Sequence, residues 1–425
     1  MTVRMTVRLI RTARTAVTAA TAVLVTLVSP AAGSVQAAGA ATEQPNVERA
    51  CDTAPAGQAR CLALIRTDVH GGLGVRGPAA AAKARVGGAD TAETELPAGY
   101  GPADLRAAYG LPSTGGEGQT IALVGAYDNP TAESDLAVYR ATYGLPPCTA
   151  DNGCFRKVNQ RGDTEPLPAS GGPSGWAVET ALDLQMASAA CPRCDILLVE
   201  ADEPLMSDLG AAVDTAVALG ATVVSNSYGG TEAHGTVGFA KNYSHPGVAV
   251  VAASGDSGYT IPPFPASYSS VIAVGGTSLT PADNDRGWQE TAWGGSGSGC
   301  SAWVDKPAWQ PDTDCPGRTI ADISAVADPA TGPAVYVTTT EQGSGGWTVV
   351  GGTSAASPYI AGVIALAGHP AAFSDASRLY SAPAQGLNDV TTGSTGTCHG
   401  NYLCTAVPGY DAPTGNGTPN GLSAF

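Results

Sequence analysis

Gly351-Gly352-Thr353-Ser354-Ala355-Ala356-Ser357-Pro358 is the most informative stretch of this 425-residue sequence. The residues before it, 347–350, are typical of a short strand, and the apolar residues from Pro358 onward predict a helix. The two glycines permit a tight backbone path between strand and helix. A hydroxyl at the mouth of this helix, that of Ser354, would lie near the positive end of the helix dipole. A nucleophile that attacks a carbonyl requires this arrangement.

A serine nucleophile needs a base, and histidine is the first candidate. The chain has five histidines: His70, His234, His245, His369 and His399. His234 is followed by Gly and Thr, as is the catalytic histidine of subtilisins, but in subtilisins that histidine precedes the substrate-binding strand. Here His234 follows the strand predicted at residues 223–229. We therefore interpret His234 as a surface-loop residue.

A pair of carboxylates offers another base. Glu179 and Asp183 lie in a predicted helix, Trp176-Ala177-Val178-Glu179-Thr180-Ala181-Leu182-Asp183, and their spacing puts them on one face, a turn apart. Two adjacent carboxylates repel, so one holds a proton more tightly and the pair titrates as a unit. Such a pair can take a proton from serine and return it to a leaving amine. The alternative is a solvated acidic face, which fits less well with neighbours such as Ala, Val, Leu and Met.

A third segment, Ala252-Ala253-Ser254-Gly255-Asp256-Ser257-Gly258, follows an apolar run at 248–251. Subtilisins carry at the corresponding place an asparagine that donates a hydrogen bond to the oxyanion. An ionised Asp256 only accepts hydrogen bonds. It could stabilise an oxyanion only as a neutral carboxylic acid. The alternative is an Asp/Gly turn after a strand.

Together, Glu-x-x-Leu-Asp, Ser-Gly-Asp-Ser-Gly and Gly-Thr-Ser-Ala-Ala-Ser-Pro resemble the signature of the sedolisins, the serine-carboxyl peptidases. The resemblance covers residues 100–425. It implies that Ser354 is the nucleophile, Glu179 the general base, Asp183 its orienting partner and Asp256 the oxyanion-hole acid. It also implies endopeptidase activity on polypeptides at acidic pH. This pH range fits the residues, because a carboxylate base and a protonated donor coexist at neutral pH only with large pKa shifts.

The fold implied by the resemblance is α/β and subtilisin-like, with a central, mostly parallel sheet flanked by helices in a single large catalytic domain, residues 100–425. The sequence pattern agrees, because apolar runs alternate with helical patterns. The runs that predict strands lie at residues 120–124, 196–200, 222–227, 248–253 and 271–274. The patterns that predict helices lie at residues 131–143, 176–189 and 208–219.

The N-terminal residues 1–40 are predicted to be a signal peptide, because four arginines precede an apolar stretch at 16–28 and a run of small residues. The apolar stretch is shorter than the roughly 20 residues of a membrane span. We therefore expect a secreted, extracellular protein. Residues 41–99 are predicted to be a short pro-region or N-terminal extension, too short for the large folded propeptide usual among sedolisins.

Ten cysteines in an exported chain predict disulfides. They occur in close pairs, for which we predict local bridges, although the sequence leaves the connectivity open. The pairs are Cys51 and Cys61, Cys148 and Cys154, Cys191 and Cys194, Cys300 and Cys315, and Cys398 and Cys404.

The tail, about 386–421, carries acidic loops on either side of the last cysteine pair. Carboxylates and backbone carbonyls are the hard oxygen ligands that Ca²⁺ prefers. The resemblance implies one structural Ca²⁺ ion in this region, with the ligands Asp389, Val390, Val407, Gly409 and Asp411. The alternative is two acidic loops without a metal.

A net charge of −16, with 14% charged residues, argues against nucleic-acid and anionic-membrane partners. We expect a monomer that acts on polypeptide substrates. Two alternatives remain open: a neutral subtilisin-type protease that uses His234, and a catalytically inactive secreted binding protein on a peptidase scaffold.

Overall fold

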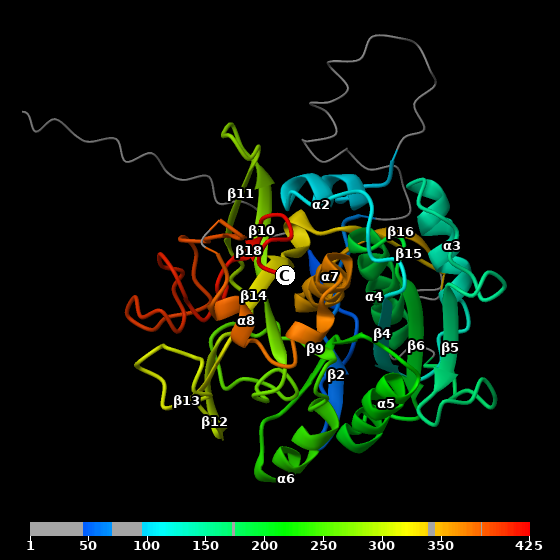
Figure 1. The fold of residues 1–425 in the computed structure, drawn as a ribbon, viewed down its shortest axis with the longest axis horizontal. Coiled ribbons are helices and arrows are strands. Elements are labelled where there is room, and N and C mark those ends of the chain that lie inside the picture. The colour runs from blue at the N-terminus through cyan, green and yellow to red at the C-terminus, as the bar shows by residue number, and fades with distance from the viewer. Residues whose placement is uncertain (1–45, 70–95, 172–174, 339–344, 384) are drawn as a thin grey trace, which may run out of the picture. The chain divides into compact units, whose positions relative to one another are not determined.

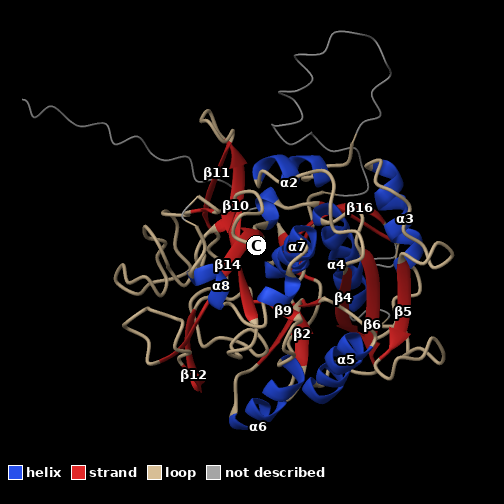
Figure 2. Ribbon diagram, viewed as in Figure 1, coloured by secondary structure: helices blue, strands red, loops and turns tan. Residues whose placement is uncertain are grey.

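Short apolar runs of the sequence form the strands of a large, mostly parallel sheet (Figure 1; Figure 2). The computed structural model describes residues 46–69, 96–171, 175–338, 345–383 and 385–425. All five predicted strands are confirmed: β4 (Thr120–Ala126), β6 (Asp195–Ala201), β7 (Val223–Asn226), β9 (Ala249–Ala253) and β10 (Ile272–Pro281). They pair in parallel in the order β10-β9-β7-β4-β6, and they are almost wholly buried.

Three further strands, which the apolar runs did not predict, extend the sheet. β5 (Phe155–Asn159) pairs in parallel with β6, β14 (Ile323–Val326) pairs in parallel with β10, and β11 (Trp288–Ala292) pairs antiparallel with β10. The sequence did not predict β5 and β11, because both are edge strands with exposed residues. Such strands mix polar and apolar residues instead of forming a continuous apolar run. The predicted α/β, mostly parallel architecture is therefore confirmed.

Two buried helices, α4 (Trp176–Ala190) and α7 (Thr353–Ala367), pack directly against each other beside the sheet (Figure 1). Every residue of α4 is buried, including the carboxylates of Glu179 and Asp183. Gly362 permits the close packing, because a methyl group there would lie 2.5 Å from the Cβ atom of Ala190. The other two predicted helices are also present: α3 (Ala132–Thr142) packs against α4, and α5 (Met206–Ala218) packs against β4 and β6.

The predicted start of α7 was wrong by five residues. The helix begins at Thr353, so Pro358 lies inside it. Proline has no N–H, so the carbonyl of Ser354, four residues earlier, loses its usual helical partner. The hydroxyl of Ser227 lies 3.5 Å from that carbonyl, although its proton has a shorter contact, of 2.6 Å, with Asp183.

The N-terminal segment 46–69 has ordered secondary structure, which the sequence did not predict. β1 (Val47–Arg49) pairs with β3 (Leu64–Arg66), and β2 (Ala59–Cys61) pairs with β8 (Tyr228–Gly230). The predicted signal peptide, 1–40, and residues 41–45 and 70–95 of the predicted extension lie outside the described residues. The remaining short elements are the helices α2 (Pro102–Ala108), α6 (His234–Val237) and α8 (Ser377–Tyr380) and the strands β12 (Gly299–Asp305), β13 (Gly317–Ile320), β15 (Ala334–Val337), β16 (Gly346–Gly351), β17 (Leu387–Asn388) and β18 (Thr418–Pro419).

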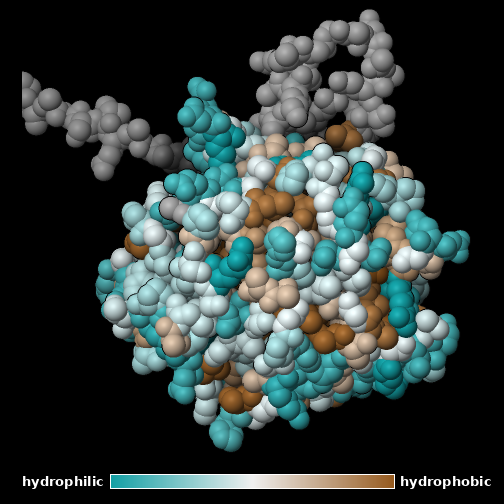
Figure 3. All heavy atoms as spheres, viewed as in Figure 1, coloured by the Kyte–Doolittle hydropathy of each residue, from teal (hydrophilic) through white to brown (hydrophobic). Residues whose placement is uncertain are grey.

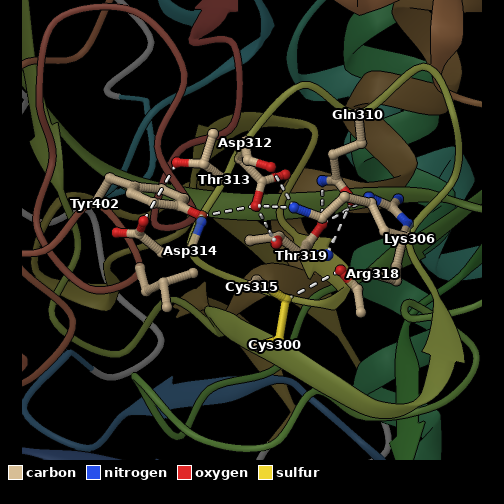
Figure 4. Close-up of polar contacts among 12 residues, drawn as sticks. Cys300, Lys306, Gln310, Asp312, Thr313, Asp314, Cys315, Arg318, Thr319 and Tyr402 are labelled. Carbon is tan, nitrogen blue, oxygen red and sulfur yellow. Dashed lines mark hydrogen bonds and ion pairs between the residues drawn. A yellow bond between two sulfur atoms is a disulfide. The ribbon is translucent and has the colours of Figure 1, made fainter.

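All five cysteine pairs form local disulfides, as predicted. One of them, Cys300–Cys315, lies beside a polar network that attaches the C-terminal tail to the loop before β13 (Figure 4). The buried carboxylate of Asp312 is at its centre and accepts hydrogen bonds from Lys306 at 2.9 Å, Thr319 at 2.9 Å and Tyr402 at 2.7 Å. Protein contacts alone therefore hold part of the tail in place.

The face shown in Figure 3 is mainly hydrophilic, with small hydrophobic patches between polar side chains. In the part of the chain that the structure describes, every helix is too short or too polar to cross a bilayer.

Candidate active site

The turn between β16 and α7 places Ser354 as the second residue of the helix, fully buried. Gly352, at the helix N-cap, has a φ of 94°, in the left-handed region that favours glycine. A methyl group on Gly352 would also lie 2.0 Å from the carbonyl oxygen of Leu62. Glycine is thus required at this position for two reasons. The chain around Leu62 passes directly over the serine turn.

Ser354 and Glu179 are in direct contact. The Oγ atom of Ser354 donates a hydrogen bond of 2.9 Å to Oε2 of Glu179, one turn into α4, and lies 3.2 Å from the carbonyl oxygen of Ser227. The packing of α4 against α7 brings these two side chains together. This distance is within the reach that a general base requires of the proton it removes.

Asp183 lies one turn further along α4, and Ser227 Oγ donates to its Oδ1 atom at 2.6 Å. The side chains of Glu179 and Asp183 are buried, at 1% and 2% exposure, so the pair is not a solvated acidic face. Burial raises the pKa of Glu179 well above its usual value, and the nearby Asp183 raises it further. Burial likewise raises the pKa of Asp183. Both carboxyl groups therefore bind a proton more tightly than they would in water.

Asp256 faces the serine turn from the loop after β9. Its Oδ1 atom accepts hydrogen bonds from the backbone N–H of Thr353 at 2.8 Å and from its hydroxyl at 2.9 Å. Its Oδ2 atom is buried and has no hydrogen-bond partner among the described residues. Burial raises the pKa of Asp256 to about 6, although the bonds from Thr353 and the charges of Arg49 and Arg60 oppose this rise. A proton on Oδ2 would turn this free oxygen into a donor.

Sequence reasoning missed Ser227 and Thr353. Ser227 contacts both Asp183 and the Ser354 carbonyl, and Thr353 orients Asp256. The threonine could have been found, because it precedes the serine inside the quoted motif. Ser227 could not, because nothing in its local pattern distinguishes it from an ordinary strand-end serine.

The alternative base His234 and a further acidic residue, Asp128, lie elsewhere. His234 is exposed and packs edge-on against Trp303, with 5.8 Å between ring centroids. Asp128, which follows β4, forms an ion pair of 2.5 Å with Lys157 on β5. Neither of them hydrogen-bonds to Ser354, Glu179 or Asp183 in the described part of the chain.

The five residues predicted as calcium ligands lie in two tail loops. Val407 N donates to Asp411 Oδ2 at 3.0 Å, and Gly409 N donates to Asp389 Oδ2 at 2.9 Å. Burial raises the pKa of Asp411 to about 7, and the charge of Asp389 adds to this rise. The carbonyls of Val390, Val407 and Gly409 accept no hydrogen bond from any described residue.

These residues fit a hard cation. The charge of Asp389 acts on Asp411, and the three carbonyl oxygens accept no hydrogen bond from a described residue. Carboxylate and carbonyl oxygens form a donor set suited to Ca²⁺. No group of three or more His, Cys, Asp or Glu side chains converges within the described ranges, so carbonyls would have to complete the coordination. A bound cation there would neutralise the two carboxylates and link the two loops.

We expect calcium to stabilise the folded chain. A ligand that binds only the folded state contributes about 2.7 kcal/mol at a hundredfold excess over its Kd, so EDTA should lower the melting temperature. The pKa of Asp411, about 7, means that protons compete with calcium below that pH. The effect of EDTA should therefore be larger at pH 7.5 than at pH 5, as measured by scanning calorimetry.

Asp411→Asn removes the charge but keeps the size, and it should abolish the dependence on calcium. Asp283→Asn, at an exposed aspartate, serves as the control. A melting temperature that does not respond to EDTA at either pH, with no metal found by elemental analysis, would contradict this prediction.

Comparison with known proteins supports the subtilisin-like fold. The subtilase family model, Peptidase S8, matches residues 174–378. Kumamolisin from Bacillus sp. (strain MN-32) is 31% identical over an alignment of 371 residues, which covers 78% of this chain and 64% of kumamolisin. Sedolisin from Pseudomonas sp. (strain 101) is 35% identical over 175 residues, or 36% of this chain and 28% of sedolisin. The chain therefore spans less than two thirds of the length of these relatives.

Among solved structures, Pseudomonas sedolisin matches with a TM-score of 0.63 and 26% identity, covering 76% of this chain and 95% of that chain. The family model and the structural match together support a subtilisin-like domain of the serine-peptidase class. The similarity in sequence to kumamolisin and sedolisin, and in structure to sedolisin, supports assignment of the chain to the sedolisin family, with a subtilisin-like fold.

Proposed function

We propose that the protein is a secreted endopeptidase that hydrolyses polypeptides at acidic pH by acyl transfer through Ser354. The observation that carries the proposal is the 2.9 Å hydrogen bond from Ser354 Oγ to Glu179 Oε2, in a site that also holds the unpartnered Oδ2 atom of Asp256. Export is supported by the predicted signal peptide and by the five disulfides.

In this mechanism, Ser354 Oγ attacks the substrate carbonyl carbon while Glu179 takes its proton. Asp183, held by Ser227, keeps Glu179 oriented and shares a proton with it. The neutral carboxyl of Asp256 donates from Oδ2 to the oxyanion as the tetrahedral intermediate forms. Glu179 then gives the proton to the leaving amine, and water hydrolyses the acyl-enzyme by the same steps.

The pH range follows from these roles. Asp256 must be protonated to donate, and its pKa of about 6 makes activity fall as pH rises through this value. The pair of Glu179 and Asp183 must hold one proton rather than two, so activity also falls at strongly acidic pH. A bell-shaped profile with its maximum below pH 6 is expected.

Cleavage of denatured casein by purified wild-type protein and by Ser354→Ala, measured across pH 3 to 8, tests the proposal. We expect a maximum in the acidic range and a loss of at least about 10⁴-fold in the variant, because its nucleophile is gone. Activity that peaks at neutral pH would favour the subtilisin-type alternative. No cleavage by the wild type at any pH would favour an inactive binding protein.

A further inference from the structure

The N-terminal segment 46–69 lies in the site in the manner of a bound peptide. Its β2 pairs antiparallel with β8, with Cys61 opposite Tyr228 and Ala59 opposite Gly230. Its β3 pairs antiparallel with β16, with Leu64 opposite Gly351. The segment thus runs extended between the strand that follows Ser227 and the strand that leads into α7. Addition of a strand to exposed edges is a common mode of peptide recognition.

Between these two paired stretches, one peptide bond meets the reacting groups. The backbone N–H groups of Leu62 and Ala63 both donate to Glu179 Oε2 at 2.8 Å, and Ser354 donates to the same oxygen atom. The carbonyl oxygen of Leu62 lies against Gly352, on the side where Asp256 Oδ2 also approaches: a methyl group on Gly352 would be 2.0 Å from the former and 2.8 Å from the latter. The base therefore contacts the nitrogen, and the oxyanion-hole acid flanks the carbonyl.

We propose that Leu62–Ala63 is a self-processing site, which Ser354 of the same molecule cleaves, and that residues 46–62 block the substrate cleft until this bond is cut. The inference rests on the proposed function and adds to it a named bond and a preference for the residue before that bond.

The surroundings of Leu62 indicate this preference. The Leu62 side chain is 3% exposed and lies beside Gly229, where an added methyl group would be 3.7 Å from its Cδ1 atom and 3.0 Å from Pro263. The adjoining cavity, of about 490 Å³, is also lined by Gly255. An apolar subsite without bulky walls, closed by a proline, suits an aliphatic side chain of leucine size.

Covalent and polar contacts hold the segment in this register. The Cys51–Cys61 disulfide closes a loop that ends directly before Leu62. Arg49 donates to the Asp256 carbonyl at 3.2 Å. The backbone of Ala50 passes so close to α4 that a methyl group on Gly175 would lie 1.7 Å from its carbonyl oxygen. These contacts lie on the N-terminal side of the bond, so they fix the part of the segment that would become the acyl half.

The chemistry is the proposed reaction carried out within one chain. Ser354 Oγ bonds to the Leu62 carbonyl carbon, and its proton passes to Glu179. The Leu62–Ala63 C–N bond breaks, and the proton moves from Glu179 to the nitrogen of Ala63. Water then hydrolyses the ester, which leaves a carboxylate at Leu62, a new amino terminus at Ala63 and a regenerated serine.

Full-length protein purified at neutral pH and shifted to pH 4 tests the proposal, with the products followed by intact-mass spectrometry and N-terminal sequencing. We expect a new terminus that reads Ala-Leu-Ile-Arg. It should form with a half-life that does not depend on protein concentration. Cleavage of added casein should begin only as this product forms. Ser354→Ala should keep the bond intact.

Leu62→Asp places a charge in the apolar subsite and should slow cleavage of this bond by about 100-fold or more. Val47→Asp makes the same change at an exposed position of the segment and should leave the rate unchanged. A synthetic peptide with the sequence of residues 58–67, in which serine replaces Cys61, gives a readout that does not depend on how Leu62→Asp folds. Processed enzyme should cut it between the residues that correspond to Leu62 and Ala63.

Different failures remain distinguishable. The self-processing site is refuted if casein is cleaved at acidic pH while the Leu62–Ala63 bond stays intact. It is also refuted if casein is cleaved but the peptide is not cut at the bond that corresponds to Leu62–Ala63. In both cases the proposed function stands. A processing half-life that shortens as protein concentration rises would refute cleavage within one molecule. If neither casein nor any bond of the chain is cleaved, the proposed function itself fails.

Discussion

Glu179→Gln is expected to lower kcat on casein by about 10⁴-fold or more, the order of loss seen when the base of a serine peptidase is removed. The amide has nearly the shape of the carboxylate, but it cannot take the proton of Ser354 across the 2.9 Å hydrogen bond. Cleavage of the Leu62–Ala63 bond should slow equally, because the same oxygen contacts the nitrogen of Ala63. Both reactions are measured in the same samples by mass spectrometry.

The stability of this variant separates loss of the base from misfolding. Burial raises the folded-state pKa of Glu179 above its unfolded value, so its ionisation costs stability as pH rises above the unfolded pKa. Glutamine carries no such cost. The melting temperature of Glu179→Gln at pH 7 should therefore equal or exceed that of the wild type. Glu117→Gln, at an exposed carboxylate paired with Arg193, should change neither turnover nor melting temperature. Turnover within tenfold of wild type in Glu179→Gln would mean that another residue is the base.

Asp256→Ala is expected to lower kcat/KM by about 10² to 10³-fold, the usual cost of losing one oxyanion-hole donor. The informative comparison is Asp256→Asn, whose amide N–H donates at every pH. In the wild type the Asp256 carboxyl loses its proton near pH 6, so activity falls above this pH. With asparagine, this alkaline limb should move to higher pH, while the acidic limb, set by the Glu179 and Asp183 pair, stays in place.

Full pH profiles of kcat/KM from pH 3 to 9, on a peptide with leucine before the cleaved bond, check this expectation. Protein in which the Leu62–Ala63 bond has been cut is used for all variants, so that the segment does not mask the site. An alkaline limb that is identical in wild type and Asp256→Asn would show that Asp256 does not act as the titrating donor.

The sequence by itself predicted the five central strands of the sheet, the helix that carries both carboxylates and a local pairing of the cysteines. Parallel strands that are buried on both faces consist of nearly continuous apolar residues. All five apolar runs identified in the sequence form strands in the structure. The four-residue spacing of Glu179 and Asp183 is a property of the helix alone, so it placed both carboxylates on one face before any packing was known. The paired cysteines are 3 to 15 residues apart in the sequence, so local pairing was the natural prediction.

Only the tertiary structure decided which groups meet those carboxylates. Glu179 receives its three hydrogen bonds from Ser354, Leu62 and Ala63, which lie 175, 117 and 116 residues away. Asp183 is held by Ser227 across 44 residues. Such contacts produce no periodic pattern in the local sequence, because they depend on how α4, α7, β8 and the N-terminal segment pack. Residues 41–99 were predicted to be a short extension, and nothing in their composition indicated a strand in the cleft. The edge formed by β8 and β16 exists only once the sheet is assembled, so only the folded chain could show that Leu62 and Ala63 lie there.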